Sequence, residues 1–401
     1  MNILAIILCV SFAFAVLALV LTVVNCIIYA RPPAPSETGS PGSLGPLNPL
    51  DPLDPLITVC IPARNEEENI AACVRSVLAN GHSNLEVLVY DDQSSDRTPH
   101  ILRDLIAADA RVRAASTVSL PAGWNGKQHA CWRMAQQARG QWMIFTDADV
   151  RFEPECIGRA LASAWQRKAQ LVSTFPRQIT GSLAEDLAVP MIFFVLFSYL
   201  PMPMMRSGNS PTASAGCGQF LMVTREAYDK SGGHSAFKDS MHDGVKMPRE
   251  VRKAGFHTDL FDGTDLVSVR MYRGLAQTWR GFTKNAFEGI GSLGLLLFFT
   301  VVHLIAHVLP WIVAFMAGAK WFSGSLTSDW RAAGVVAGAC VALNLLQRSI
   351  LAVRFRQGIV PVILHPIGVL FMTVIQWYSL YLAKTNRRAW RGRVGVGVAA
   401  G

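Results

Sequence analysis

Charged side chains are scarce in this 401-residue sequence: Asp, Glu, Lys and Arg make up 16% of it, whereas hydrophobic residues make up 51%. Soluble domains carry about 25% charged residues, so this balance argues against a purely soluble chain. The apolar excess lies mainly at the two ends of the sequence, which indicates membrane spans rather than a larger core. The formal charge of +9 does not indicate nucleic-acid binding, because the basic residues form no single stripe. Several of them flank apolar segments, where lipid headgroups are expected: Arg348, Arg354, Arg356, Arg387, Arg388, Arg391 and Arg393.

Two sequence patterns are also missing. The eight cysteines form no C-x-x-C pair and no Cys/His cluster with zinc spacing, so we interpret them as unpaired core thiols in a reducing compartment. No glycine-rich phosphate loop of the P-loop or Rossmann kind precedes a helix. A nucleotide would therefore have to be bound by other groups.

The N-terminal segment, residues 1–30, contains no charged side chain. A cleaved signal peptide would begin with basic residues, so this segment is predicted to be a transmembrane anchor. Arg31 follows it directly, which favours a start outside and a cytosolic continuation. Residues 31–56 contain eight prolines and are predicted to form an extended linker.

From Ile57 onward short β-rich runs alternate with helical patterns. The predicted strands are Ile57–Ile61, Leu85–Tyr90, Trp142–Thr146 and Leu171–Phe175. In the first helical pattern, Asn65 is expected to be the cap and Glu68 to complete a capping box. This alternation predicts an α/β domain over residues 57–288, with a mostly parallel sheet covered by helices on both faces.

The C-terminal part, residues 289–386, contains three further apolar runs at Ile290–Ala319, Ala332–Leu346 and Ile359–Ala383, and a basic tail follows at 387–401. Three spans after one anchor would place this tail outside, against the positive-inside tendency. A re-entrant segment around Pro361 and Pro366 would return the tail to the cytosol, and the sequence leaves both arrangements open.

Leu187–Met205 is also uncharged and long enough to span a membrane. A span there would place Asp149 and Asp243 on opposite sides of the membrane, which a working active site that contains both would not allow. We therefore predict a helix in the membrane interface, broken by its prolines, that guides a lipid acceptor.

Acidic residues follow three of the predicted strands. Glu66 comes after the first, Asp92 after the second, and Asp147 and Asp149 after the third. Ligands of open α/β sheets bind beyond the carboxyl ends of the strands. Asp147 and Asp149 are suited to hold a divalent cation, Mg²⁺ or Mn²⁺, against the phosphates of a nucleotide. The alternative is that these aspartates only cap the following helices.

The order of Ile57–Glu67, Val87–Asp96 and Phe145–Asp149 resembles the inverting glycosyltransferases of family 2, which have the GT-A nucleotide-diphospho-sugar transferase fold. The resemblance extends over roughly Ile57 to Glu288. Gly123–Lys127 followed by Asp147–Asp149 is similar to the membrane-bound branch that glycosylates carotenoid or hopanoid-like lipids, and the closing Trp390–Arg393 is similar to lipid-directed members such as ceramide glucosyltransferases.

This resemblance implies site residues. Glu66, Asp92, Asp147 and Lys127 would contact the nucleotide-sugar donor, and Asp149 would hold the metal together with Asp147. Asp92 would contact the base, Asp147 the nucleoside, and Lys127 the diphosphate or the wall of the base pocket. The alternative for Lys127 is an exposed residue that opens a helix.

A second group of residues is implied on the acceptor side. Asp243 would be the general base, although His242 stands where the family has an acidic residue, and the alternative for Asp243 is a helix cap. Gly216, Gly218 and Gln219 belong to a segment that resembles the loop lining the acceptor, or that forms a plain turn entering a strand.

Gln277–Arg280 stands where polymerising relatives carry Gln-x-x-Arg-Trp, but Trp279 and Arg280 are here in the reverse order. Trp279 is predicted on the acceptor side, and Arg280 and Lys284 near the diphosphate. The alternative for the two basic residues is that they anchor the chain at the membrane.

The sequence thus predicts an integral protein of the plasma or inner membrane whose cytosolic domain transfers a sugar from a nucleotide-diphosphate donor to a lipid hydroxyl or carboxyl group. The two alternatives are a processive polysaccharide synthase, against which the altered Gln277–Arg280 motif argues, and a membrane scaffold or lipid transporter built on a decayed domain.

Overall fold

The computed structural model describes residues 3–34, 54–385, 387, 389–390 and 393–394. The chain divides into two compact units. The first, here called the membrane unit, comprises Met1–Ile28, Thr180–Pro201 and Tyr272–Thr385; the second, the sheet unit, comprises Tyr29–Ile179, Met202–Met271 and Asn386–Gly401. This division differs from the predicted boundaries, which assigned all of residues 57–288 to one domain.

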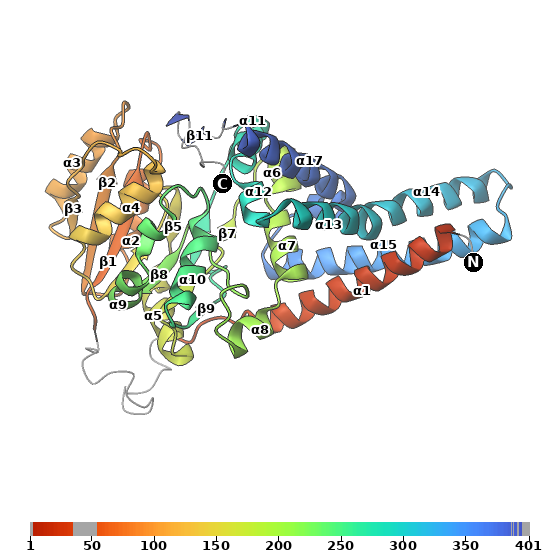
Figure 1. Ribbon diagram of the computed structural model, residues 1–401, viewed down its shortest axis with the longest axis horizontal. Coiled ribbons are helices and arrows are strands. Elements are labelled where there is room, and N and C mark those ends of the chain that lie inside the picture. The colour runs from red at the N-terminus through yellow and green to blue at the C-terminus, as the bar shows by residue number, and fades with distance from the viewer. Residues whose placement is uncertain (1–2, 35–53, 386, 388, 391–392, 395–401) are drawn as a thin grey trace. The chain divides into compact units, whose positions relative to one another are not determined.

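The sheet unit is built on a seven-stranded sheet in the order β3-β2-β1-β4-β8-β6-β9 (Figure 1). Its strands are β1 (Ile57–Ala63), β2 (Leu85–Asp91), β3 (Val112–Ala114), β4 (Trp142–Phe145), β6 (Leu171–Ser173), β8 (Leu221–Thr224) and β9 (Thr258–Leu260). Neighbouring strands are parallel except at β8, which runs antiparallel to both β4 and β6. The predicted α/β class is confirmed, and the four predicted strands correspond to β1, β2, β4 and β6.

Helices cover both faces of this sheet. Side chains alternate between the two faces along each strand, so each face contributes apolar side chains to a core. On one face the core packs against α2 (Ile70–Leu78), α3 (Thr98–Ala108) and α5 (Cys156–Arg167). On the other face it packs against α4 (Gly126–Gln137), α9 (Arg225–Lys230) and α10 (Asp243–Lys253). A small second sheet contains β5 (Val150–Phe152), β10 (Val267–Val269) and β7 (Arg177–Gln178).

The start of α2 differs from the prediction. The helix begins at Ile70, with Asn69 as N-cap and no side-chain capping bond. Asn65 instead has a φ of 53°, and its side-chain oxygen accepts a hydrogen bond from the Ser95 N–H at 2.8 Å. The predicted capping box at Asn65 and Glu68 is therefore wrong, because Asn65 joins the loop after β1 to the loop after β2.

The membrane unit contains four helices that are long and apolar enough to cross a membrane. They are α1 (Ile3–Ile28), the continuous Leu293–Phe322 helix, α15 (Ser328–Arg354) and α17 (His365–Lys384). Leu293–Phe322 consists of α13 (Leu293–His303), a π-helical turn over Leu304–Val308 and α14 (Leu309–Phe322). These helices match the predicted anchor and the three predicted C-terminal apolar runs.

Buried polar side chains connect the helices of this unit. The Gln347 side chain on α15 donates to Thr22 Oγ1 on α1 at 2.9 Å and to Ser198 Oγ at 2.7 Å. Arg348 is fully buried, with Nε 3.4 Å from the Pro361 carbonyl oxygen. The prediction that Arg348 flanks the membrane among the headgroups is therefore wrong. Interhelical hydrogen bonds of this kind contribute about 0.6 kcal/mol on average in a membrane protein, so these bonds orient the helices more than they stabilise them.

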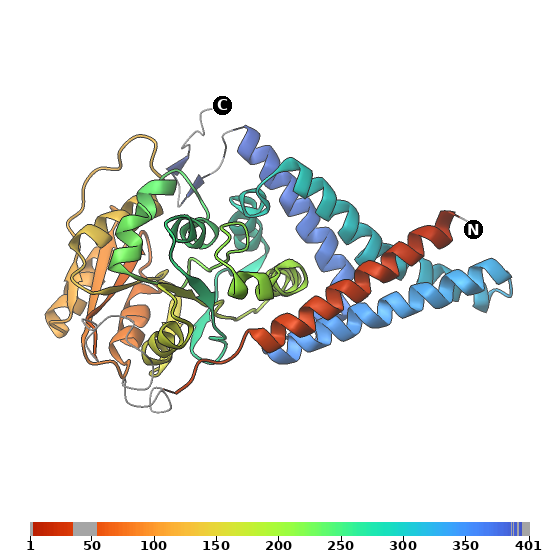
Figure 2. The same ribbon diagram turned by 60° about the horizontal axis from the view of Figure 1, so that its bottom comes forward.

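α1 and α15 lie side by side over much of their length (Figure 2). The short turn Ser323–Thr327 reverses the chain between α14 and α15. Asn344 of α15 donates to the Ala306 carbonyl at 3.0 Å, level with the middle of the Leu293–Phe322 helix. At 1.5 Å per residue, α15 ends roughly 15 Å beyond Asn344. Its end therefore lies near the level at which the Leu293–Phe322 helix begins.

α17 occupies only part of the depth of the unit. It follows the short helix α16 (Val360–Ile363), and Nε2 of His365, its first residue, lies 3.2 Å from Nδ1 of His307 in the middle of the Leu293–Phe322 helix. Near its other end, Ser379 Oγ accepts from the Phe287 N–H at 3.0 Å, just before that helix starts. The segment from α16 to α17 thus enters and leaves the unit at the same end, which favours the re-entrant alternative, although α17 is itself long and apolar enough to cross a membrane.

The Leu187–Met205 segment is divided among α6 (Leu183–Ala188), α7 (Met191–Tyr199) and α8 (Met202–Ser207). The nine residues of α7 reach only about 14 Å, too short to span, as predicted. The segment differs from a free interfacial helix, however, because α7 packs against α1, α15 and α17. The Asn25 amide of α1 donates to the Phe197 and Leu200 carbonyls at 2.8 and 2.7 Å, which satisfies the end of α7.

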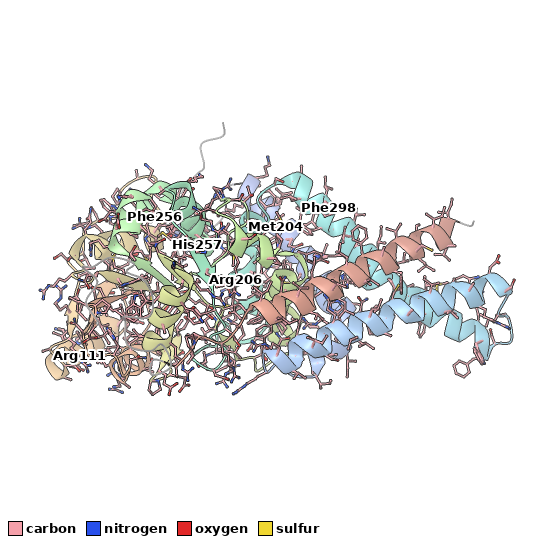
Figure 3. The ribbon with its side chains drawn as sticks, turned by 90° about the horizontal axis from the view of Figure 1, so that it is seen from below. Arg111, Met204, Arg206, Phe256, His257 and Phe298 are labelled. Carbon is pink, nitrogen blue, oxygen red and sulfur yellow. The ribbon has the colours of Figure 1, made fainter. Side chains whose placement is uncertain are left out.

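α8 belongs to the sheet unit. Arg206, labelled on α8 in Figure 3 beside Met204, is bound to the sheet. Its Nε lies 3.1 Å from both carboxylate oxygens of Asp259 on β9. Met204, on the same short helix, is 62% exposed. The ion pair therefore holds α8 on the sheet while the helix presents an apolar side chain outward.

The predicted linker, residues 31–56, lies mostly outside the described residues, at 35–53, and most of the predicted basic tail, 387–401, does so as well. The described start of the linker is bound to the sheet unit: Arg31 pairs with Asp265, and the Asp262 N–H donates to the Ala30 carbonyl at 2.9 Å. Just before it, buried Tyr29 hydrogen-bonds Thr174 Oγ1 at 3.0 Å.

A prediction about topology follows from the re-entrant segment. We expect epitope tags inserted in segment 35–53 and after Gly401 to be accessible only when the membrane is permeabilised, because the predicted cytosolic orientation together with a re-entrant segment would place the catalytic domain and the tail on the same side. A tag in the Ser323–Thr327 turn is the control and should be accessible in intact cells. A tail tag that behaves like the turn tag would contradict the re-entrant arrangement, and a segment tag accessible from outside would contradict the cytosolic orientation.

Candidate active site

The carboxyl ends of β1, β2 and β4 lie at one edge of the sheet because these strands are parallel. β8 runs the opposite way, so its first residue, Leu221, pairs with Phe145, the last residue of β4. The Gly216–Phe220 segment therefore enters the sheet at the edge where Asp147 leaves it. Thr146 Oγ1 fixes this junction by donating to the Gln219 carbonyl at 2.7 Å.

Lys127 lies between two carboxylates at this edge. Its Nζ is 2.6 Å from Asp147 Oδ1 and 2.9 Å from Asp243 Oδ2. The Gly218 carbonyl oxygen lies 3.5 Å from the same nitrogen. The structure thus brings together the predicted donor residues Lys127 and Asp147, the predicted base Asp243 and the predicted acceptor loop. Lys127 is not the exposed helix-opening residue of the alternative interpretation.

Burial and charge act against each other in this cluster. Burial disfavours both charged groups, but Asp147 and Asp243 outweigh it at Lys127 and raise the pKa of the ammonium well above its ordinary value. At Asp243 burial is likewise outweighed, chiefly by the charge and hydrogen bond of Lys127, so the pKa of the carboxyl lies below its ordinary value. Asp243 is therefore ionised at neutral pH.

The opposing loop has glycines where it approaches the Asp243 side chain and α10. It is the first residue of α10, and its Oδ1 accepts from the adjacent Gly244 N–H at 2.9 Å. A Cβ atom at Gly218 would overlap the Asp243 carboxylate, and one at Gly216 would lie 2.9 Å from a ring carbon of Pro248 on α10. Gly216 and Gly218 are thus small because α10 approaches their backbone closely. His242 is the N-cap of α10, but Asp243 bonds a backbone N–H of the first turn, so the helix-cap alternative for Asp243 stays open.

Asp92 and Glu66 lie at the same edge of the sheet but have other neighbours. Asp92 is buried, and its Oδ2 is 3.7 Å from Nη1 of Arg64, which the sequence analysis did not select. Glu66 is also buried, and its side chain accepts from Asn69 Nδ2 at 3.1 Å at the start of α2. Their predicted contact with the donor base and ribose stays a prediction.

Comparison with known proteins agrees with this geometry. Residues 58–232 match the family described as glycosyl transferase family 2. The chain carries a family 2 glycosyltransferase domain. The match starts in β1 and includes Asp92, Lys127, Asp147 and the Gly216–Phe220 loop.

Curated relatives of this glycosyltransferase include the 4,4'-diaponeurosporenoate glycosyltransferases of Staphylococcus aureus and Staphylococcus haemolyticus. The S. aureus protein (strain MRSA252) is 25% identical over 302 residues, which cover 73% of this chain and 71% of the relative. The S. haemolyticus protein is 26% identical over 264 residues, covering 64% and 66% respectively. Among solved structures, a mannosyltransferase from Pyrobaculum calidifontis, solved with GDP-mannose and Mn²⁺, aligns with a TM-score of 0.52 at 15% identity over 95% of this chain and 98% of its own. The last similarity supports the GT-A fold of the domain.

The donor set of the glycosyltransferase fits a hard divalent cation. Asp147 and Asp149 lie two residues apart in the turn between β4 and β5, and the Asp147 side chain is about one-third exposed. No group of three or more His, Cys, Asp or Glu within the described ranges is arranged to hold a metal. Two carboxylates nevertheless suffice for Mg²⁺, because substrate phosphates and water complete its shell.

Three predicted site residues lie in the other unit. Trp279 and Arg280 are on α11 (Gly274–Thr283), and Lys284 is its C-cap. The Trp279 ring packs against Tyr378 and Phe371 of α17, with ring centroids 5.3 and 6.1 Å away, whereas Arg280 is exposed. The predicted roles of these residues at the donor and acceptor stay predictions.

Sequence reasoning missed two residues beside the cluster. Gln178 on β7 donates from its amide to Gln219 Oε1 at 3.3 Å. His234, in the 3₁₀ helix Gly233–Phe237, is buried, and burial lowers its pKa to about 3, so it is neutral beside Asp243. No local motif marks either residue, since both reach the site only through the packing of elements distant in sequence.

Proposed function

We propose that this glycosyltransferase transfers a sugar from a nucleotide-diphosphate donor to a hydroxyl or carboxyl group of a membrane lipid, by a single in-line displacement that inverts the anomeric carbon. The supporting observation is the convergence of Asp147 and Asp243 on Lys127 at the carboxyl edge of the sheet. Such an edge is where open α/β folds bind their ligands.

The residues divide the task between them. Asp147 and Asp149 would hold a divalent cation, which when bound offsets the charge that develops on the leaving diphosphate. Asp243 is ionised and would accept the proton of an acceptor hydroxyl. The glycines at 216 and 218 leave room for its carboxylate at the loop that the sequence predicts on the acceptor side.

A lipid acceptor is supported by two independent facts. The described part of the chain contains four helices long and apolar enough to cross a membrane. Its curated relatives are named for transfer to 4,4'-diaponeurosporenoate, a carotenoid carboxylate. The alternative of a processive polysaccharide synthase has less support, because Trp279 packs against Tyr378 and Phe371 rather than standing free to stack on a sugar chain.

The test is transfer by the purified full-length protein in detergent, with labelled UDP-glucose, UDP-N-acetylglucosamine or GDP-mannose as donor. We expect label to enter a total membrane lipid extract in the presence of Mn²⁺ or Mg²⁺, and not to enter soluble oligosaccharides. Mass spectrometry of the product then identifies the acceptor group. Transfer to soluble oligosaccharides alone would contradict the proposal.

A further inference from the structure

The Lys127 ammonium lies within the site, in ion-pair contact with two carboxylates. An ammonium carries three N–H donors, and Nζ has three oxygen neighbours: Asp147 Oδ1 at 2.6 Å, Asp243 Oδ2 at 2.9 Å and the Gly218 carbonyl at 3.5 Å. A lysine that serves mainly as a phosphate ligand would have donors directed toward an open site. Here both strong contacts are to carboxylates of the site itself.

The position of Lys127 relative to Asp243 is fixed by backbone contacts. Asn125 caps α4 by accepting from the Lys127 N–H at 2.9 Å, and its own N–H donates to the Lys238 carbonyl at 2.7 Å. Gln128, next along α4, donates from its amide to the Ser240 carbonyl at 3.2 Å. The start of α4 is therefore attached to the chain just before α10, and Lys127 moves together with Asp243.

Lys127 is also the permanent positive charge facing this base. Other titratable side chains also lie near Asp243, namely His234, His242, Cys131 and Cys217, and Asp147 shares the Lys127 ammonium. His234 is neutral because burial lowers its pKa to about 3, burial raises the pKa of the Cys131 and Cys217 thiols, and His242 adjoins Asp243 as the N-cap of α10. A carboxylate as buried as Asp243 loses its charge readily when its partner is removed. Among the described side chains, Lys127 is the one that forms an ion pair with Asp243.

We propose that Lys127 is a positioning residue that acts through Asp243: its ammonium fixes the direction of the carboxylate and joins it to Asp147 on the donor side. This inference rests on the proposed function of Asp243 as the base. It replaces the predicted role of Lys127 as a donor ligand, and it implies that removing the ammonium impairs the transfer step more than it impairs donor binding.

The experiment compares Lys127→Met, Lys127→Arg and Asp243→Asn, singly and as the Lys127→Met/Asp243→Asn double variant, in the full-length protein. Lys253→Met is the matched control, since Lys253 lies at the exposed end of α10 and pairs only with Glu250 in the described contacts. Donor affinity is measured by calorimetry with Mn²⁺, and the transfer rate with the labelled lipid-extract assay. If Lys127→Met does not fold, Lys127→Gln is used, because its amide can donate to either carboxylate without a charge.

We expect Lys127→Met to lower kcat by about 10²–10⁴, the usual contribution of a positioned base, with donor affinity changed less than about tenfold. Lys127→Arg should recover part of the rate because it keeps the charge. The double variant should be no slower than Asp243→Asn alone, since residues that act as one unit are not additive.

Two results would overturn the inference. One is a loss of donor affinity with kcat retained, which would make Lys127 a donor ligand. The other is an additive double variant, which would mean that Lys127 acts independently of Asp243. If Asp243→Asn transfers at the parent rate, the assignment of Asp243 as the base fails. If only the inference about Lys127 fails, Asp243→Asn is still inactive, but the effects of Lys127→Met and Asp243→Asn on the rate add up in the double variant.

Discussion

Asp243→Asn should lower the rate of transfer to a hydroxyl acceptor by about 10²–10⁴ while donor affinity with Mn²⁺ stays near that of the parent protein. Asparagine keeps the shape that fits beside Gly218, so α10 and the opposing loop should remain in place. Its amide cannot take up the hydroxyl proton, and this loss falls on the transfer step. The measurement is transfer rate beside calorimetric donor affinity, on the same preparation.

The control for this variant is Asp239→Asn, because Asp239 is exposed four residues earlier in the chain. It should transfer at the parent rate. An acceptor carboxylate arrives already ionised and needs no base, so the comparison of a lipid alcohol with a lipid acid on Asp243→Asn also reports on the acceptor group. An unchanged rate with a lipid alcohol would contradict the assignment of Asp243 as base.

Asp149→Asn should weaken metal-dependent donor binding by at least 10- to 100-fold, the range by which even supporting groups of metal sites alter affinity. The amide keeps the size of the side chain but removes the charge that a hard cation requires. Asp147→Asn should lose donor affinity as well, and it also leaves Lys127 with one carboxylate fewer. Calorimetric titration of donor, with and without Mn²⁺, is the measurement.

Asp104→Asn is the matched control for this pair, since Asp104 is an exposed aspartate on α3. Its donor affinity should equal that of the parent protein in both conditions. The metal assignment would be refuted by an Asp149→Asn protein that binds donor as tightly as the parent in the presence of Mn²⁺. In that case the acidic turn between β4 and β5 would be structural.

Local sequence patterns were sufficient for the strands and for the membrane helices. β1, β2, β4 and β6 could be predicted because each is a short β-rich run between turn residues, and α1 because 26 residues without a charged side chain form one helix. Asp92 and Asp147 could be assigned to one edge for the same reason, because parallel strands place their carboxyl ends together.

Patterns failed where a residue's partner lies far away in sequence. Asn65 resembles a helix cap, but its side chain bonds Ser95 in the loop of the neighbouring strand. Arg348 resembles a headgroup anchor, but it is buried, and its guanidinium donates to the carbonyl oxygens of Pro361 and Pro190. Leu187–Met205 resembles one hydrophobic segment, yet contacts with α1 and α15 bury α7 in one unit, and Arg206 holds α8 in the other.

The sequence by itself determined the fold class, the membrane helices and the acidic ends of the strands, because these depend on hydrophobic periodicity and on residues adjacent in the chain. Only the tertiary structure decided how the site is assembled. β8 runs antiparallel beside β4, and this reversal carries Gly218 to the edge where Asp147 lies. The close approach of α10 to that loop then places Asp243 against Lys127, a pairing set by packing between distant elements that no spacing in the sequence encodes.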